Sequence, residues 1–179
     1  MRVIAGEFRS RRLKSLPGLN TRPTPDRLRE TLFNILAPRI ESCVFVDAYA
    51  GTGAVGIEAL SRGASRAIFI ERSRAAVEVI RDNLASLGLA GRSEVSTGKV
   101  LPVLERVKAD IVFLDPPYEL EKEYKDALEL LSTREDTGLV IAQHAGKVEL
   151  AKSYGDLHQS RVVKQGDNAL SFYSWACSA

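Results

Sequence analysis

Short apolar runs alternate with amphipathic stretches over most of the chain, a pattern typical of a parallel sheet covered by helices on both faces. Buried strands are expected at Val44–Asp47, Ala67–Glu71, Glu94–Thr97, Asp110–Asp115 and Gly138–Ala142. Helices are expected between them, at Gly53–Arg62, from Ser73 to Leu87, near Val100–Val107 and at Glu121–Leu131. The fold class indicated is therefore α/β, with a mostly parallel sheet.

The two ends of the chain follow other patterns. Near the C-terminus, Ser160–Lys164 and Ala169–Trp175 flank the turn signal QGDN, which predicts an antiparallel hairpin. Near the N-terminus, RVIAG and RRLKSL predict two short strands of a basic hairpin, followed by the turn-rich stretch from Leu16 to Pro25.

A helix is predicted from Pro25 to Leu36, with Thr24 as its N-cap and Pro25 at its first position. We therefore divide the chain into an N-terminal hairpin and linker, residues 1–24, and a main domain, residues 25–179.

Composition is that of an ordinary soluble domain: of 179 residues, 45% are hydrophobic and 27% charged. The two cysteines form neither a disulfide framework nor a metal-ligand pattern, which favours a cytoplasmic location and no bound metal. No apolar run approaches the roughly 20 residues that cross a bilayer, and the charged start does not fit a secretion signal. A monomer without membrane contact is expected.

Charge is unevenly distributed, although the net charge is only +2. Residues 1–40 hold nine basic and three acidic side chains, so the rest of the chain is slightly acidic. A basic segment on a near-neutral body is consistent with a polyanionic partner and equally with a solvated face.

A glycine-rich loop follows the first predicted strand, in VFVDAYAGTGAVG. Gly51, Gly53 and Gly56 fit G-x-G-x-x-G, which lets backbone approach a ligand closely and also suits a dinucleotide. Glu71, 20 residues after Gly51, could accept hydrogen bonds from ribose hydroxyls. Asp47 at the strand end would repel a pyrophosphate and suits a cationic ligand such as the methionine end of S-adenosylmethionine. Tight helix–strand packing alone is the alternative role of the glycines.

A second motif, Asp115-Pro116-Pro117-Tyr118, follows the fourth predicted strand and falls on the same rim of the sheet. A carboxylate and a carbonyl that accept N–H bonds from an exocyclic base amine can free its delocalised lone pair for attack on a methyl group. The prolines fix φ and stiffen the loop, and Tyr118 can stack on the base. A strand-ending turn with a solvated Asp is the structural alternative.

With these motifs, the sequence resembles the bacterial small-subunit (16S) ribosomal RNA guanine-N2 methyltransferases, which are class I enzymes of the DPPY type. The resemblance covers nearly the whole chain, and its most specific segment is RPTPDRLRETLFN at 22–34. It implies a Rossmann-like fold with a seven-stranded sheet, S-adenosylmethionine as cofactor and S-adenosylhomocysteine as product. It further implies methyl transfer to N2 of one guanine of 16S ribosomal RNA in an assembled or assembling small subunit.

The resemblance also implies residue roles. The methionine end of the cofactor would lie against Asp47, Gly51 and Gly53, the ribose against Glu71, and the adenine against Arg72, with Lys99 and Val100 nearby; Tyr49 could touch cofactor or base. The guanine would be held by Asp115, Pro116, Pro117 and Tyr118. Ribosomal RNA would be contacted by Arg9, Arg11, Arg12, Lys14, Arg22 and Thr24.

Two positions depart from the family pattern. Gly98 stands where Asn or Asp is frequent, so a backbone group near Lys99 would have to contact the adenine amine. Gln143 stands where a Glu is expected. Three alternatives stay open: an amino-methyltransferase acting on adenine N6 or cytosine N4, a nicotinamide-dependent oxidoreductase suggested by the glycine pattern, and an RNA-binding module without catalysis.

Overall fold

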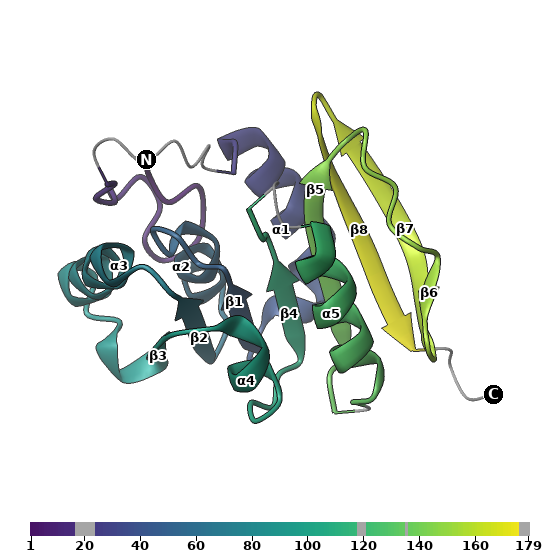
Figure 1. The fold of residues 1–179 in the computed structure, drawn as a ribbon. Coiled ribbons are helices and arrows are strands. Elements are labelled where there is room, and N and C mark those ends of the chain that lie inside the picture. The colour runs from purple at the N-terminus through teal and green to yellow at the C-terminus, as the bar shows by residue number, and fades with distance from the viewer. Residues whose placement is uncertain (17–23, 118–120, 135, 176–179) are drawn as a thin grey trace.

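A single eight-stranded sheet organises the chain (Figure 1). The computed structural model describes residues 1–16, 24–117, 121–134 and 136–175. The strand order is β3-β2-β1-β4-β5-β8-β7-β6. The order therefore reverses between β1 and β4, the place where open α/β sheets bind ligands.

Five strands form the parallel part of the sheet. They are β1 (Val44–Ala48), β2 (Arg66–Glu71), β3 (Ser93–Thr97), β4 (Ile111–Leu114) and β5 (Leu139–Ala145). Each coincides with a predicted strand to within three residues at either end. Four of them are covered on both faces and are mostly apolar, whereas the edge strand β3 is polar and partly exposed. The α/β class and the parallel arrangement predicted from the sequence are confirmed.

The other end of the sheet is antiparallel. It contains β6 (Ser153–Tyr154), β7 (Leu157–Gln165) and β8 (Asn168–Trp175), and β8 lies between β5 and β7. The predicted C-terminal hairpin is confirmed. The expected number of seven strands is wrong by one, because the two-residue β6 pairs with β7 and is too short to leave an alternating pattern.

Helices cover both faces of the sheet (Figure 1). They are α1 (Asp26–Ile40), α2 (Ala54–Ser61), α3 (Arg74–Ser86), the short α4 (Val100–Leu104) and α5 (Glu121–Ser132), with a 3-10 turn, η1, at Ala90–Arg92. Because side chains alternate along a strand, Phe45 and Phe113 pack with α1, α2 and α3, whereas Val46 and Val112 pack with α4 and α5. The sheet thus separates two hydrophobic cores.

The start of α1 differs from the prediction. Pro25 occupies the N-cap position and no side chain caps the helix, so Thr24 is not its N-cap. The Thr24 hydroxyl instead donates a hydrogen bond to the side chain of Gln143, 3.2 Å away. The helix also continues to Ile40, beyond the predicted end at Leu36.

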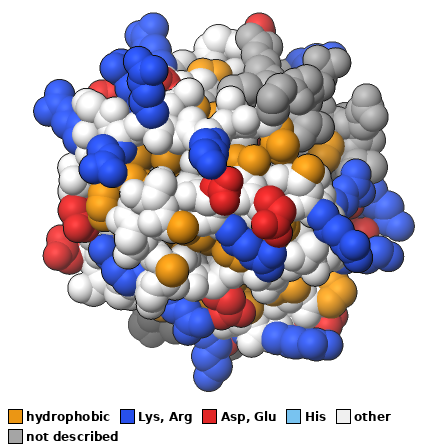
Figure 2. Space-filling model, turned by 90° about the vertical axis from the view of Figure 1, so that its left-hand side faces the viewer, with side chains coloured by type: hydrophobic (Ala, Val, Ile, Leu, Met, Phe, Trp, Pro, Cys, Tyr) orange, Lys and Arg blue, Asp and Glu red, His pale blue; other side chains and the backbone are white. Residues whose placement is uncertain are grey.

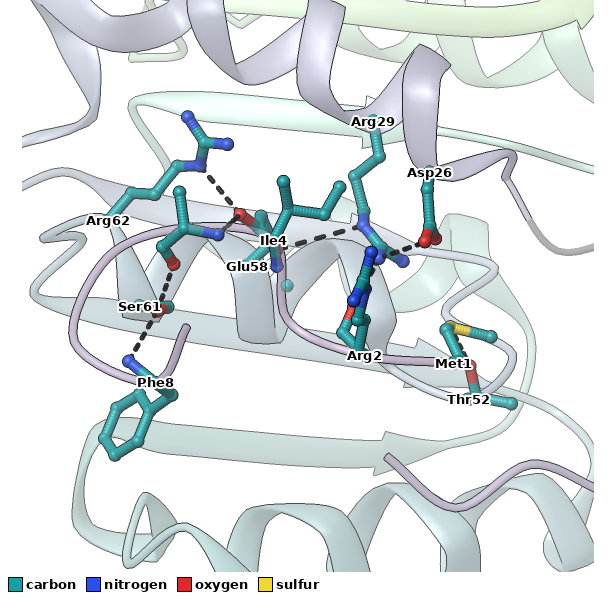
Figure 3. Close-up of polar contacts among 12 residues, drawn as sticks. Met1, Arg2, Ile4, Phe8, Asp26, Arg29, Thr52, Glu58, Ser61 and Arg62 are labelled. Atoms are coloured by element: carbon teal, nitrogen blue, oxygen red, sulfur yellow. Dashed lines mark hydrogen bonds and ion pairs between the residues drawn. The ribbon is translucent and has the colours of Figure 1, made fainter. Parts of the chain in front are cut away.

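The N-terminal segment turns back on itself as predicted, but its pairing is too short to form two strands: the amide of Val3 donates to the Arg11 carbonyl and that of Leu13 to the Met1 carbonyl, each at 3.0 Å. Its only bridge outside the sheet is an isolated antiparallel pair between Arg2 and Arg12, among the residues described. The amides of Ile4 and Ala5 donate to the carboxylate of Glu58 in α2, at 2.8 and 3.0 Å, rather than to a neighbouring strand (Figure 3). A buried side chain of α2 therefore satisfies the amides just beyond the short paired region, where the pairing ends.

Glu58 also anchors two arginines (Figure 3). Its side chain is fully buried, Arg62 Nε donates to it at 2.8 Å, and the Nε of fully buried Arg29 lies 3.8 Å away. Arg29 reaches the N-terminal segment as well, donating to the Arg2 carbonyl at 2.6 Å. Val3 is buried in the same core as α1 and α2. The division of the chain into an N-terminal hairpin and linker, residues 1–24, and a main domain, residues 25–179, stays a prediction.

Among the described residues, no helix combines the length and apolar character needed to cross a membrane.

Candidate active site

The predicted site residues meet at the carboxyl ends of the parallel strands. Ala48 pairs with Leu114 on one side and with Ile70 on the other, so the residues that follow these strands share one rim. The strand residues Phe45, Phe113 and Ile141 face α1 and α2. Asp47, Asp115 and Gln143 each come two positions later, and side chains two residues apart along a strand point to the same face. The strand register therefore brings them together.

Asp47 is almost completely buried at this rim, with 2% of its surface exposed. Its Oδ2 accepts a hydrogen bond of 2.8 Å from the backbone amide of Gly56 in α2. Burial raises the pKa of Asp47 to about 8; the Gly56 amide opposes this, whereas Asp115 and Glu71 add to it. A cationic ligand would favour the ionised form.

The three glycines of the loop have different surroundings. A Cβ at Gly51 would meet nothing within 4 Å, so this position is open to a ligand. A Cβ at Gly56 would lie 2.4 Å from Cε1 of Phe69, so Gly56 lets α2 pack closely on β2. Gly53 caps α2 with a positive φ of 78° and contacts Phe69 and Ile80. Helix packing accounts for Gly53 and Gly56, whereas Gly51 has a positive φ of 57°, which favours glycine, and open space beside it.

Glu71 holds the glycine loop in place at the end of β2. Its Oε2 accepts from the amide of Gly51 at 2.9 Å and its Oε1 accepts from the amide of Ser73 at 2.7 Å. Each carboxylate oxygen has a second lone pair, so both can still accept a hydroxyl donor. The amide of Gly98 donates to the Glu71 carbonyl at 3.0 Å, which ties the loop after β3 to the same place.

Asp115 is partly exposed directly after β4. Gln143 Nε2 donates to its Oδ2 at 3.1 Å. Burial raises the pKa of Asp115 to about 7, and the nearby Thr24 hydroxyl acts in the opposite direction. Pro116 is buried and Pro117 exposed, while the predicted stacking residue Tyr118 lies outside the described residues.

Other predicted cofactor residues lie around this rim. Arg72 and Lys99 are exposed, and Lys99 stands at the N-cap of α4. Val100 is the first residue of α4 and packs its side chain in the core, so only its backbone could contact a ligand. Tyr49 has a positive φ of 65° and packs against the core beneath α5, on the opposite face from Asp47. Burial and the nearby Glu123 raise its pKa.

The predicted RNA-binding residues lie on the N-terminal segment. Arg9, Arg11 and Arg12 are exposed, and Lys14 pairs with Asp82 at 2.9 Å. Figure 2 shows Lys and Arg side chains spread over this side of the molecule, with Asp and Glu between them. Arg22 lies outside the described residues.

His144 does not belong to the acidic rim. It is buried on the α5 side of the sheet, where its Nε2 lies 2.8 Å from Ser171 Oγ and its Nδ1 lies 3.0 Å from the Ala145 carbonyl. Burial lowers its pKa. These contacts fit a structural histidine, not a general base for the rim.

A surface hollow lies at the other end of the strands. Its lining includes Cys43, Asp110 and Gly138, which precede β1, β4 and β5. Because parallel strands present all their carboxyl ends at one edge, this hollow is separate from the acidic rim. In the described part of the chain, no group of three His, Cys, Asp or Glu residues is placed to bind a metal.

Two residues with contacts at the site were not recognised from the sequence. Gln143 was noted only as a departure, although aligning DIVFLD with GLVIAQ as parallel neighbours would have placed it beside Asp115. Asn83 of α3 donates to the carbonyls of Lys14 and Thr52, each at 3.2 Å, and accepts from the amide of Lys14 at 2.7 Å. It joins the basic segment to the glycine loop, and no local pattern signals this role.

The rim can hold a small cationic ligand. Carboxylates lie where an ammonium or sulfonium group would be favoured, Glu71 offers acceptors for hydroxyls, and Gly51 leaves room for close approach. This donor set fits the methionine and ribose parts of S-adenosylmethionine.

Comparisons with known proteins agree with this geometry. The family described as Conserved hypothetical protein 95 matches residues 1–174. The Bacillus subtilis protein YlbH, provisionally named an rRNA methyltransferase, is 35% identical over 97% of this chain and 98% of its own length. Ribosomal RNA small subunit methyltransferase D of Escherichia coli is 43% identical over 66% of this chain and 60% of its own.

Solved structures show the same fold. The Escherichia coli protein yhhF, provisionally named a methyltransferase, is 34% identical, with a TM-score of 0.84 and 99% of both chains covered. An RNA methyltransferase from Salinibacter ruber, solved with S-adenosyl-L-homocysteine, is 17% identical with a TM-score of 0.64, covering 88% of this chain and 95% of its own. The second likeness concerns the fold alone.

Proposed function

The chain belongs to the Conserved hypothetical protein 95 family, and on that premise we propose that it transfers a methyl group from S-adenosylmethionine to N2 of one guanine in 16S ribosomal RNA. Relatives named Ribosomal RNA small subunit methyltransferase D confirm the resemblance seen in the sequence. They support ribosomal RNA methylation, whereas the guanine and its N2 atom belong to this proposal. Methyltransferase relatives favour it over the oxidoreductase alternative.

The observation that carries the proposal is the position of Asp115 beside Asp47 on one rim. S-adenosylmethionine, when bound, supplies a methyl group activated by its sulfonium. Asp47 would favour the cationic end of that molecule, and Glu71 would accept from its ribose hydroxyls. The loop after β4, which carries Asp115, would then lie beside the bound cofactor, and holding two reactants in a fixed orientation is the main lever for a transfer of this kind.

Asp115 and the carbonyl of Pro116 would accept the two N–H bonds of the guanine amine. Acceptance by both draws the nitrogen toward sp³ geometry and frees its lone pair. With the amine held in this way, N2 would accept the methyl group that the cofactor supplies, and the extra proton on N2 would then leave to water. Asp115 has to be ionised to accept, so methyl transfer should weaken as pH falls below about 7.

The N-terminal segment would hold the RNA backbone. It is fixed to α2 by Glu58 and lies next to the glycine loop, where Met1 contacts Thr52. Exposed arginines on such a segment neutralise phosphates and release counterions. This arrangement supports binding of RNA close to the rim without providing base recognition of its own.

The proposal is tested by transfer of labelled methyl to small subunits that lack their native modification, with naked 16S RNA and duplex DNA in parallel. We expect label on guanine N2 in the subunits or the RNA. Label on adenine or cytosine would instead establish another amino-methyltransferase. No label in any substrate would refute methyl transfer to nucleic acid.

Asp115→Ala should abolish turnover while cofactor binding persists. Asp110→Ala is the matched control, since Asp110 precedes the same strand at its opposite end and should leave turnover in place. Cofactor binding is measured by calorimetry with S-adenosylhomocysteine. Loss of binding in Asp115→Ala would contradict the separate roles given to Asp47 and Asp115.

A further inference from the structure

Gln143 connects three segments that are distant in the sequence. Its side chain is buried in β5, with 2% exposed. Its Nε2 donates to Asp115 Oδ2 at 3.1 Å, and its Oε1 accepts from the hydroxyl of Thr24 at 3.2 Å. Both ends of the amide are therefore used.

The backbone fixes where this amide lies. Leu114 pairs with Ala142, so Gln143 follows on the neighbouring strand beside Asp115. The carbonyl of Gln143 also accepts from the hydroxyl of Tyr124 in α5, at 2.6 Å. Strand pairing and helix α5 together set the backbone of Gln143, and Thr24 sets its side chain.

We propose that Gln143 is a positioning residue for methyl transfer, whose amide favours the ionised form of Asp115 and aims its carboxylate as an acceptor for the amine of the base. The inference rests on the proposed function, which it deepens. Asp115 contacts the base in that function, whereas Gln143 acts only through Asp115.

An amide suits this role because its N–H is a donor at every pH. A carboxyl group in its place would put two acidic groups within hydrogen-bonding distance, and the pair would retain a proton to higher pH. Turning the amide around would place its oxygen against the Asp115 carboxylate, so that two acceptors would face each other, whereas the Thr24 hydroxyl can either donate or accept. The Asp115 carboxylate thus selects the orientation in which Gln143 donates, and Thr24 holds the other end of the amide.

Among the described residues, the carboxyl groups that interact on this rim come from β1, β2 and the end of β4. Asp47 of β1 and Glu71 of β2 are acidic, and the pKa of Asp47 is raised by both Asp115 and Glu71. His144 of β5 lies on the other face of the sheet, 2.8 Å from Ser171. Gln143 is thus a neutral donor to Asp115 on an acidic rim.

The test compares Gln143→Glu and Gln143→Leu with wild type over about pH 5 to 10, where a general acid or acceptor of this kind titrates. The matched controls are Gln159→Glu and Gln159→Leu, because Gln159 bonds to Ser171 and Tyr173 in the antiparallel part of the sheet. Single-turnover methyl transfer to the RNA substrate gives the rate. Calorimetry with S-adenosylhomocysteine, thermal melting and circular dichroism report the cofactor site and folding.

In Gln143→Glu, we expect the acid limb of the rate profile to move to higher pH by about one unit or more. In Gln143→Leu, the rate should fall by about tenfold or more while S-adenosylhomocysteine affinity and RNA KM stay near wild type. Thr24→Val should lower the rate in the same direction and Thr24→Ser should restore it. The Gln159 variants should follow the wild-type profile.

A wild-type pH profile in Gln143→Glu would overturn the inference, and so would a rate that falls equally at every pH. If Gln143→Leu does not fold, the isosteric Glu variant decides alone. Carboxyl ¹³C titration of Asp115, without substrate, should show a higher pKa in Gln143→Glu than in wild type. An unchanged titration refutes the inference even if wild type methylates nothing, an outcome that would refute only the proposed function.

Discussion

Replacing Asp47 with Asn should flatten the dependence of stability on pH. Burial raises the pKa of Asp47 to about 8 in the folded protein, whereas an unfolded Asp titrates near 4. Between these values the folded chain binds a proton that the unfolded chain does not. The stabilisation from this group is therefore complete below about pH 4 and is lost as pH rises through about 8.

The expected magnitude is about 1.4 kcal/mol of unfolding free energy per pH unit inside this window. Asn has nearly the same shape and retains an oxygen that can accept from the amide of Gly56, which now donates to Asp47 at 2.8 Å. Asn cannot ionise, so the free energy of unfolding of the Asp47→Asn variant should fall less steeply than that of wild type as pH increases. The difference between the two proteins isolates Asp47 from other titrating groups.

Urea unfolding at several pH values measures this difference, with the fluorescence of the single tryptophan, Trp175, as the probe. Asp156→Asn, which removes an exposed carboxylate between β6 and β7, is the matched control. Parallel curves for wild type and Asp47→Asn would show that Asp47 is ionised in the folded protein, and the reasoning from burial would then be wrong.

Three further perturbations test the packing and the RNA contact. Gly56→Ala should cost about 1–3 kcal/mol, because its Cβ would lie 2.4 Å from the ring of Phe69; urea unfolding checks this, and Phe69→Leu should relieve the loss. Glu58→Ala should cost about 3–5 kcal/mol, because buried Arg29 would keep only Asp26 as a carboxylate partner and the amide of Ile4 would lose its acceptor; unchanged hydrogen exchange at Ile4 would contradict the anchoring role. RNA affinity measured against salt should show a smaller slope after combined alanine substitution of Arg9, Arg11 and Arg12.

The positions of the main site residues could be predicted from the strands that precede them in the sequence. Asp47 and Asp115 follow apolar runs that must be buried strands, and parallel strands end at the same rim. Their meeting there was predictable because strand direction and period are local properties of the chain. The unequal surroundings of Gly51 and Gly56 were not predictable, since the ring of Phe69 reaches Gly56 from another strand.

The basic segment shows where local pattern fails. RVIAG and RRLKSL have the alternation of two strands, yet Glu58 binds the amides of Ile4 and Ala5 and leaves a single bridge. The sequence around Glu58 does not indicate which backbone amides its carboxylate will accept hydrogen bonds from. The competition between strand pairing and a buried acceptor is decided only when the segment packs against α2.

The sequence by itself determined the α/β class, the succession of strands and helices and the two motifs on one rim, because a strand buried on both faces is an apolar run and a helix buried on one face is amphipathic. Tertiary structure alone decided the partners of Thr24, which caps no helix and donates instead to Gln143 across 119 positions. Such contacts depend on how distant elements pack, and a polar side chain with several available partners does not specify one locally. The sequence therefore predicts that Asp115 lies on the rim, whereas its orientation is set by a contact that forms only in the folded molecule.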